Sequence, residues 1–68
     1  MNSIAKSGTP MEILEAALKK EHAAHDFYAE VREHSTVEFV RTLADELCNE
    51  ELRHVRLIED HIVRLRRG

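Results

Sequence analysis

The stretch Glu46–His61, ELCNEELRHVRLIEDH, decides the fold of this chain. It contains neither Gly nor Pro, and Leu47 and Ile58 lie on one helical face at the spacing of an amphipathic helix. Between them on that face stand Glu51 and His54, where a packed helix usually carries apolar side chains. The stretch therefore predicts a helix with a carboxylate and an imidazole at the centre of its packing face.

An earlier segment carries the start signal of another helix. Thr9 is placed to accept hydrogen bonds from exposed amides, Pro10 suits the first helical position, and Glu12 completes a capping box. Good helix formers follow without Gly or further Pro. The sequence predicts a helix over about residues 10–34, preceded by a flexible N-terminal tail at residues 1–8.

A second capping box, STVE from Ser35 to Glu38, predicts that the next helix begins almost at once. This helix is expected to cover about residues 36–67 and to end at Gly68. Residues 9–68 are therefore expected to form one all-α domain, an antiparallel two-helix hairpin.

Size and composition limit what such a hairpin does. A chain of 68 residues needs a disulfide, a metal or a partner chain to be stable, and its one cysteine cannot form an internal disulfide. Cys48 is instead expected to be a small buried thiol. A net charge of −3 and few aromatic residues argue against nucleic acid, and no run of about 18 apolar residues predicts a membrane span. We expect a cytoplasmic protein, or one enclosed in a protein compartment.

Folding the hairpin at its corner brings three polar residues to one level. Residues facing each other across the two helices have numbers that add to about 72, so Glu21 faces Glu51 and Leu18 faces His54. Two carboxylates packed together repel each other and lose hydration, and a divalent cation removes both penalties. We therefore expect Glu21, Glu51 and His54 to be metal ligands.

One hairpin supplies only three ligands and leaves one side of its apolar seam uncovered. Two hairpins related by a two-fold axis form a four-helix bundle with four Glu and two His inside, the ligand set of carboxylate di-iron bundles. The sequence thus predicts a homodimer or larger homo-oligomer with a metal centre shared between chains. Carboxylate-rich sites favour Fe or Mn, and Zn is a possible substitute.

The segments EHAAHDFY, residues 21–28, and EELRH, residues 50–54, resemble half of a rubrerythrin-type ferritin-like domain. The resemblance covers about residues 10–66 and is to single-hairpin members such as the encapsulated ferritins. It implies a di-iron ferroxidase, with two iron ions per pair of chains, that oxidises Fe(II) with O2 or peroxide at a site between chains. Glu21, Glu51 and His54 would be its catalytic residues. The implied role is iron handling, iron storage or oxidative-stress defence, with an enclosing protein shell as a further partner. The chain departs from rubrerythrins in lacking a Cys-x-x-Cys pair and a second half.

Several residues near the predicted metal ligands have two interpretations. His25 and His61 are either extra metal ligands or packed histidines, and Glu50 is either a ligand or a solvated carboxylate. Tyr28 either donates a hydrogen bond near the metals, outside their ligand shell, or is plain core. Two rival functions also stay open: a non-enzymatic helical-hairpin oligomerisation module whose polar layer fixes pairing, and a metal-binding protein without redox turnover.

Overall fold

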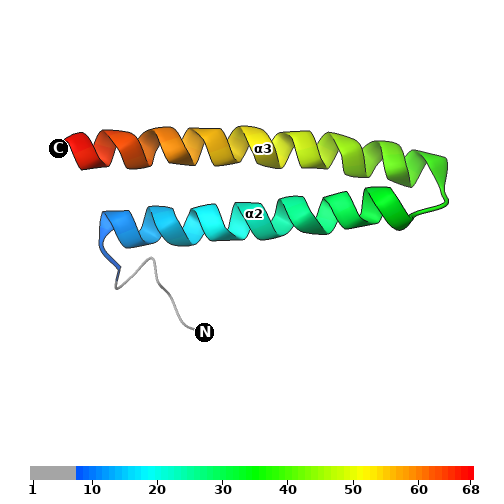
Figure 1. The fold of residues 1–68 in the computed structure, drawn as a ribbon, viewed down its shortest axis with the longest axis horizontal. Coiled ribbons are helices and arrows are strands. Elements are labelled where there is room, and N and C mark those ends of the chain that lie inside the picture. Colours follow the sequence, from blue (N-terminus) through cyan, green and yellow to red (C-terminus); the bar gives the residue numbers. More distant parts are fainter. Residues whose placement is uncertain (1–7) are drawn as a thin grey trace.

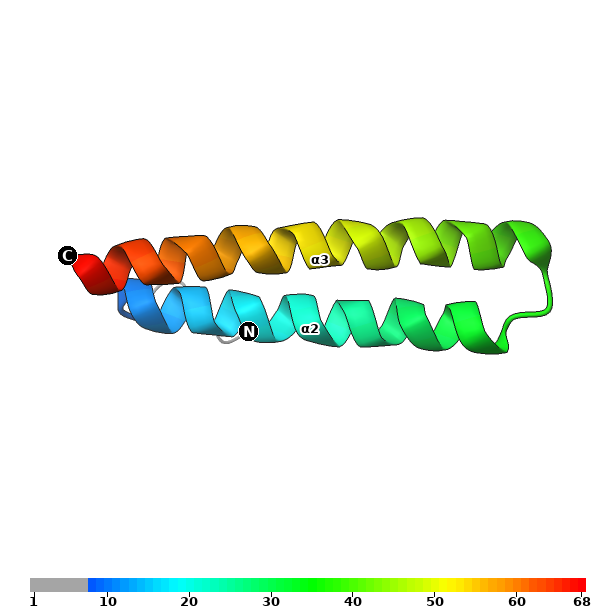
Figure 2. The same ribbon diagram turned by 45° about the horizontal axis from the view of Figure 1, so that its top comes forward.

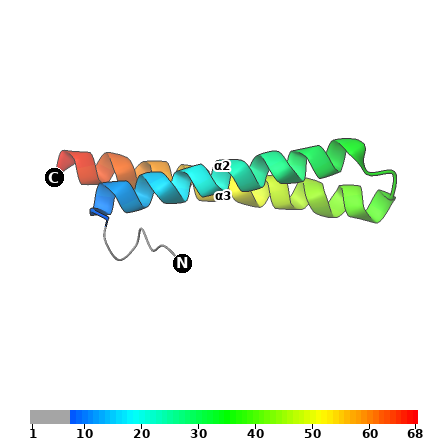
Figure 3. The same cartoon turned by 90° about the horizontal axis from the view of Figure 1, so that it is seen from below.

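The computed structural model describes residues 8–68, which form two α-helices, α2 (Pro10–His34) and α3 (Glu38–Arg67). The helices run antiparallel and side by side, joined by the three-residue corner 35–37 (Figures 1 and 2). Seen from below, they cross at a shallow angle (Figure 3). The all-α hairpin expected from the sequence is therefore present. Of the predicted tail, residues 1–8, only Gly8 falls within the described residues.

The start of α2 has the geometry that its sequence predicts. The Thr9 side-chain oxygen accepts a hydrogen bond from the Glu12 amide at 3.2 Å, and the Glu12 carboxylate accepts one from the Thr9 amide at 2.9 Å. Pro10 occupies the first turn, where a missing amide proton costs nothing. The capping box thus satisfies two amides that the helix itself leaves without partners.

The capping box predicted for the second helix is not formed. The helix α3 begins at Glu38, and Val37 precedes it with no side-chain hydrogen bond to the helix. Ser35 instead ends α2, because its amide donates to the Val31 carbonyl at 2.9 Å. The Ser35 hydroxyl then accepts from the Val37 amide at 3.2 Å and closes the corner. Because Ser35 ends α2 and closes the corner, it does not cap α3.

The buried side chains within residues 8–68 all belong to α3: Ala44, Cys48, Val55 and Ile62. Their spacing of four and then seven residues is that of one helical face pressed against a neighbouring helix. Cys48 is only 1% exposed, as expected, and its thiol donates to the His25 carbonyl at 3.7 Å.

The packing face of α3 is therefore partly rotated from the predicted one: Ala44 and Ile62 are buried as predicted, but Val55 replaces His54. The sequence places His54 on the seam, whereas Val55 occupies it and the His54 side chain is 50% exposed. Successive residues of a helix point about 100° apart, so a seam centred on Val55 leaves its neighbour at the edge. The imidazole consequently faces the open side of the hairpin.

The hairpin is one layer thick. Its shortest extent is 12 Å, the diameter of a single helix with side chains, which is about 10–12 Å. Its radius of gyration is 14.8 Å, against about 11 Å for a compact chain of this length. Two helices alone cannot cover both of their faces, so apolar surface stays exposed. No helix within residues 8–68 has the length and apolar character needed to cross a membrane.

One side of the hairpin carries both the polar cluster and two apolar hollows. Seven-residue steps keep a helix position on one face, and two such rows run along this side. The row on α2 is Leu14, Glu21 and Tyr28, and that on α3 is Leu47, His54 and His61. We call this side the open face. One hollow lies near the chain ends, lined by Pro10, Ile13, Leu14, His61, Arg64 and Leu65. The other lies near the corner, lined by Phe27, Tyr28, Val31, Val40, Leu43, Ala44 and Leu47.

The opposite side of α3 is more polar. Exposed Leu52 and Val63 lie there. At helical spacing their neighbours on that side are charged or amide residues, namely Arg41, Asp45, Asn49, Arg56 and Glu59. The open face therefore carries more apolar surface than the opposite side of α3.

Candidate metal centre

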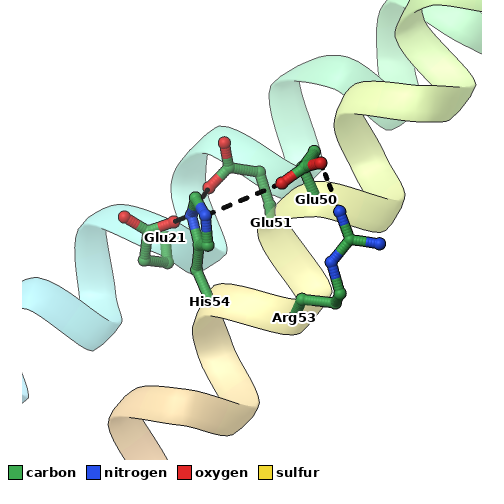
Figure 4. A network of polar contacts seen from close by, with 5 residues as sticks. All are labelled: Glu21, Glu50, Glu51, Arg53 and His54. Atoms are coloured by element: carbon green, nitrogen blue, oxygen red, sulfur yellow. Dashed lines mark hydrogen bonds and ion pairs between the residues drawn. The ribbon is translucent and has the colours of Figure 1, made fainter.

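The structure brings Glu21, Glu51 and His54 together at the middle of the hairpin (Figure 4). One ligand atom from each lies within 4.8 Å of the others. His54 Nδ1 is 3.1 Å from Oε1 of Glu21 and 3.6 Å from Oε1 of Glu51. Glu51 and His54 stand three residues apart on α3 and share a face, whereas Glu21 reaches them from α2.

The two carboxylates influence each other's ionisation. The hydrogen bond with Glu51 lowers the pKa of Glu21, and His54 lowers it further, while burial acts in the opposite direction. The same hydrogen bond raises the pKa of Glu51, and burial and the charge of Glu21 raise it further. The proximity of the two carboxylates thus separates their pKa values, and a bound cation would offset the repulsion between them.

The three side chains of the cluster are buried to different extents. The Glu51 side chain is 14% exposed, that of Glu21 27% and that of His54 50%. The acids are thus largely shielded by the helix pair, and the imidazole stands at the rim. All three side chains keep some exposure to solvent, and His54 keeps the most.

The donor set fits a divalent transition metal. Carboxylate oxygen and imidazole nitrogen together are ligands typical of Fe and Mn, and Zn also accepts them. The Glu21 and Glu51 carboxylates repel each other when both are ionised, and this repulsion favours binding of a positive ion between them. Three protein donors leave further positions free for a second copy, water or substrate.

Glu50 and Arg53 extend the cluster on its solvent side. Glu50 Oε1 lies 3.8 Å from Nε2 of His54, and its other oxygen pairs with the Arg53 guanidinium (Figure 4). Glu50 therefore faces the ring nitrogen that points away from Glu21 and Glu51. Arg53 and Glu50 stand three residues apart on α3, a spacing at which side chains of one helix meet.

The other residues singled out from the sequence lie outside the three-residue cluster. The His25 ring contacts Asp26 at 3.3 Å, and His61 Nδ1 lies 2.8 Å from the Leu57 carbonyl. Tyr28 packs edge-to-face on Phe27, with ring centroids 5.4 Å apart. His61 and Tyr28 line the two hollows of the open face. They are therefore placed to contact whatever covers that face.

Neither a protein-family model, nor a curated protein, nor a solved structure matches this chain.

Proposed function

We propose that two copies of the chain pair through their open faces and form a di-iron ferroxidase of the rubrerythrin-type ferritin-like kind. The observation that carries this proposal is the three-residue donor cluster of Glu21, Glu51 and His54, which lies at the centre of an uncovered apolar face. A charged cluster there disfavours pairing of the apolar surfaces unless its charge is compensated. Bound cations supply that compensation.

Two copies complete the ligand set. Together they offer four carboxylates and two imidazoles, which is the arrangement of carboxylate-bound di-iron centres in four-helix bundles. The hollows on either side of the cluster would be filled by the partner's apolar side chains. The resemblance of residues 21–28 and 50–54 to half of such a domain supports the same assembly.

The reaction follows from the ligands. Fe(II) is the substrate, and two Fe(II) ions supply two electrons to O2 or peroxide. Glu21 and Glu51 would hold the ions through their oxygens, and His54 through Nδ1, the nitrogen that faces both acids. Leu47 and Ile58 flank the cluster on α3 and would keep bulk water out once the partner covers them. The physiological role would be iron handling or oxidative-stress defence, and iron storage would need a higher assembly or an enclosing shell.

The test is an anaerobic Fe(II) titration followed by native mass spectrometry. We expect two irons per pair of chains in the native protein and none in Glu51→Ala. Glu59→Ala, an exposed acid on the opposite side of α3, is the matched control and should bind like the native protein. Exposure of the loaded protein to O2 should then produce Fe(III), followed by its ultraviolet absorbance.

Each rival function gives a different result in this experiment. A defined oligomer that binds no iron identifies an oligomerisation module, in which the 3.1 Å contact between His54 and Glu21 serves only to fix pairing. Iron that stays Fe(II) in O2 identifies a metal-binding protein without redox turnover. Equal binding by Glu51→Ala and the native protein removes the site assignment.

A further inference from the structure

The two ring nitrogens of His54 face different carboxylates (Figure 4). Nδ1 lies 3.1 Å from Oε1 of Glu21 and 3.6 Å from Oε1 of Glu51, whereas Nε2 lies 3.8 Å from Oε1 of Glu50. A neutral imidazole carries a proton on one nitrogen and a lone pair on the other, and the lone pair is what binds a metal ion. The ring itself therefore offers two places for a cation, an inner one beside Glu21 and Glu51 and an outer one beside Glu50.

The outer place has both the space and the acidic side chains that a cation needs. A hollow of about 440 Å³ lies there, lined by Glu46, Leu47, Asn49, Glu50 and Arg53. Glu46 and Glu50 stand four residues apart on α3, a spacing at which side chains of one helix meet. With Nε2 of His54 they offer the same kinds of donor atom as the inner place. The types of donor therefore do not decide which nitrogen takes the metal ion.

Arg53 makes the two places different. Its guanidinium pairs with Oε2 of Glu50, so the outer carboxylate already has a fixed positive partner. A second cation beside that carboxylate meets the repulsion of the guanidinium. Within residues 8–68, by contrast, neither Glu21 nor Glu51 forms an ion pair with Lys or Arg. The inner place consequently keeps the negative charge that attracts a metal ion.

The ion pair with Arg53 also leaves the other oxygen of Glu50 facing His54. The 3.8 Å from this oxygen to Nε2 is about 0.6 Å beyond the range of an N–H···O hydrogen bond. Both side chains are about half exposed, so either one can turn and close the gap. With Glu50 as acceptor, the ring proton stays on Nε2, and Nδ1 keeps its lone pair for a metal ion.

We propose that Arg53 directs the metal ion to Nδ1 of His54, because it keeps Glu50 from acting as a ligand and holds it as the acceptor for the Nε2 proton. Arg53 is thus a positioning residue, which acts on His54 through Glu50. The inference rests on the proposed function, since the inner place is the donor cluster of that centre. It also gives Glu50 a role that is neither that of a ligand nor that of a solvated carboxylate.

The test is nuclear magnetic resonance of the protein labelled with nitrogen-15 in its histidines and loaded with Zn(II). The nitrogen shifts distinguish a metal-bound ring nitrogen from a protonated one, and the signals of His54 are those missing in His54→Ala. In the native protein we expect one form of His54, with Zn(II) on Nδ1 and the proton on Nε2. Arg53→Ala should add a second form, with Zn(II) on Nε2.

Three further variants show whether this change comes from the charge of Arg53. Arg53→Lys keeps a positive charge beside Glu50 and should restore the single form. Arg56→Ala removes an arginine from the opposite side of α3 and should also give the single form. Glu50→Gln combined with Arg53→Ala removes the outer carboxylate, so the second form should disappear. The side chains of Arg53 and Glu50 are 64% and 48% exposed, so these variants should fold like the native protein.

The outcomes separate this inference from the proposed function. A second form in Arg53→Ala that is absent in Arg53→Lys establishes the role of Arg53, even if Fe(II) is not oxidised and the ferroxidase proposal fails. Zn(II) on Nδ1 alone in Arg53→Ala overturns the inference, even if the native protein oxidises Fe(II). Zn(II) on Nε2 in the native protein, or no Zn(II) bound at all, overturns it as well.

Discussion

His54 on α3 places its Nδ1 atom 3.1 Å from Oε1 of Glu21 on α2, although 33 residues separate them in the sequence. The contact joins the two helices at the level of the donor cluster. Because the imidazole is 50% exposed, the contact is worth little to folding, about 0.5 kcal/mol or less. The contact matters because it holds the Nδ1 atom of His54 beside the carboxylates of Glu21 and Glu51.

His54→Ala is accordingly expected to change metal binding much more than stability. Its free energy of unfolding, from urea denaturation of the metal-free protein, should stay within about 0.5 kcal/mol of the native value. Its Mn(II) affinity, from calorimetry, should fall at least tenfold, because one of three donors is gone. A loss of more than about 2 kcal/mol in stability with unchanged affinity would instead mean a structural histidine.

Glu51→Gln is expected to stabilise the metal-free protein. The folded state raises the pKa of Glu51, through its hydrogen bond with Glu21, its burial and the repulsion between the two charges. Ionised Glu51 is thus penalised on folding, and stability falls as pH rises from the unfolded pKa of about 4.5 through the raised folded one. Glutamine keeps a donor for Glu21 and removes the charge.

The gain of Glu51→Gln should be about 0.2–0.5 kcal/mol at neutral pH, the size of a like-charge repulsion on a helix surface. It should vanish in acid, below the unfolded pKa, where both proteins carry a neutral side chain. Urea denaturation at two pH values measures both quantities. Lower stability of the variant at neutral pH would show that the carboxylate pair holds the native fold together.

Metal affinity should depend on pH through the same residue. A ligand carboxylate must be ionised, so in acid a metal ion competes with the proton, whose binding to Glu51 the raised pKa favours. Mn(II) affinity is expected to fall as pH decreases through that pKa, about tenfold per pH unit for one proton. Calorimetry in two buffers of different ionisation enthalpy counts the protons released. Affinity that stays constant over the acid range, with no proton release, would exclude Glu51 as a ligand.

The sequence predicted the hairpin and the three donors, because both depend on local patterns. Helix caps, the absence of Gly and Pro, and antiparallel facing across a short corner are enough to bring Glu21 to the level of Glu51. The exact packing face of α3 and the cap at its start depend on competing interactions, which a sequence pattern does not show. The rotation that buries Val55 instead of His54 is set by packing against α2. The loss of the second capping box follows from Ser35 completing α2.

Glu50 offers a prediction that the sequence alone did not make. Its carboxylate lies 3.8 Å from Nε2 of His54 and is held by the ion pair with Arg53. A carboxylate on the outer nitrogen orients a ligand histidine and leaves its other nitrogen free for the metal. Glu50→Ala should therefore lower Mn(II) affinity about tenfold while the number of ions bound stays the same. Glu46→Ala, one helical turn away, is the control. An equal loss of Mn(II) affinity in both variants would mean that Glu50 acts only through its negative charge and not through His54.

A charge on the open face should prevent pairing, whereas the same charge on the other side should not. Leu47 lines the corner hollow, and Leu52, 38% exposed, lies among polar residues on the opposite side of α3. Leu47→Glu would bury an unpaired carboxylate between two copies, at a cost of several kcal/mol, so the protein should sediment as a monomer. Leu52→Glu stays in water and should sediment like the native dimer. Analytical ultracentrifugation of both variants makes the comparison, and dissociation by Leu52→Glu but not by Leu47→Glu would move the interface to the other side of the hairpin.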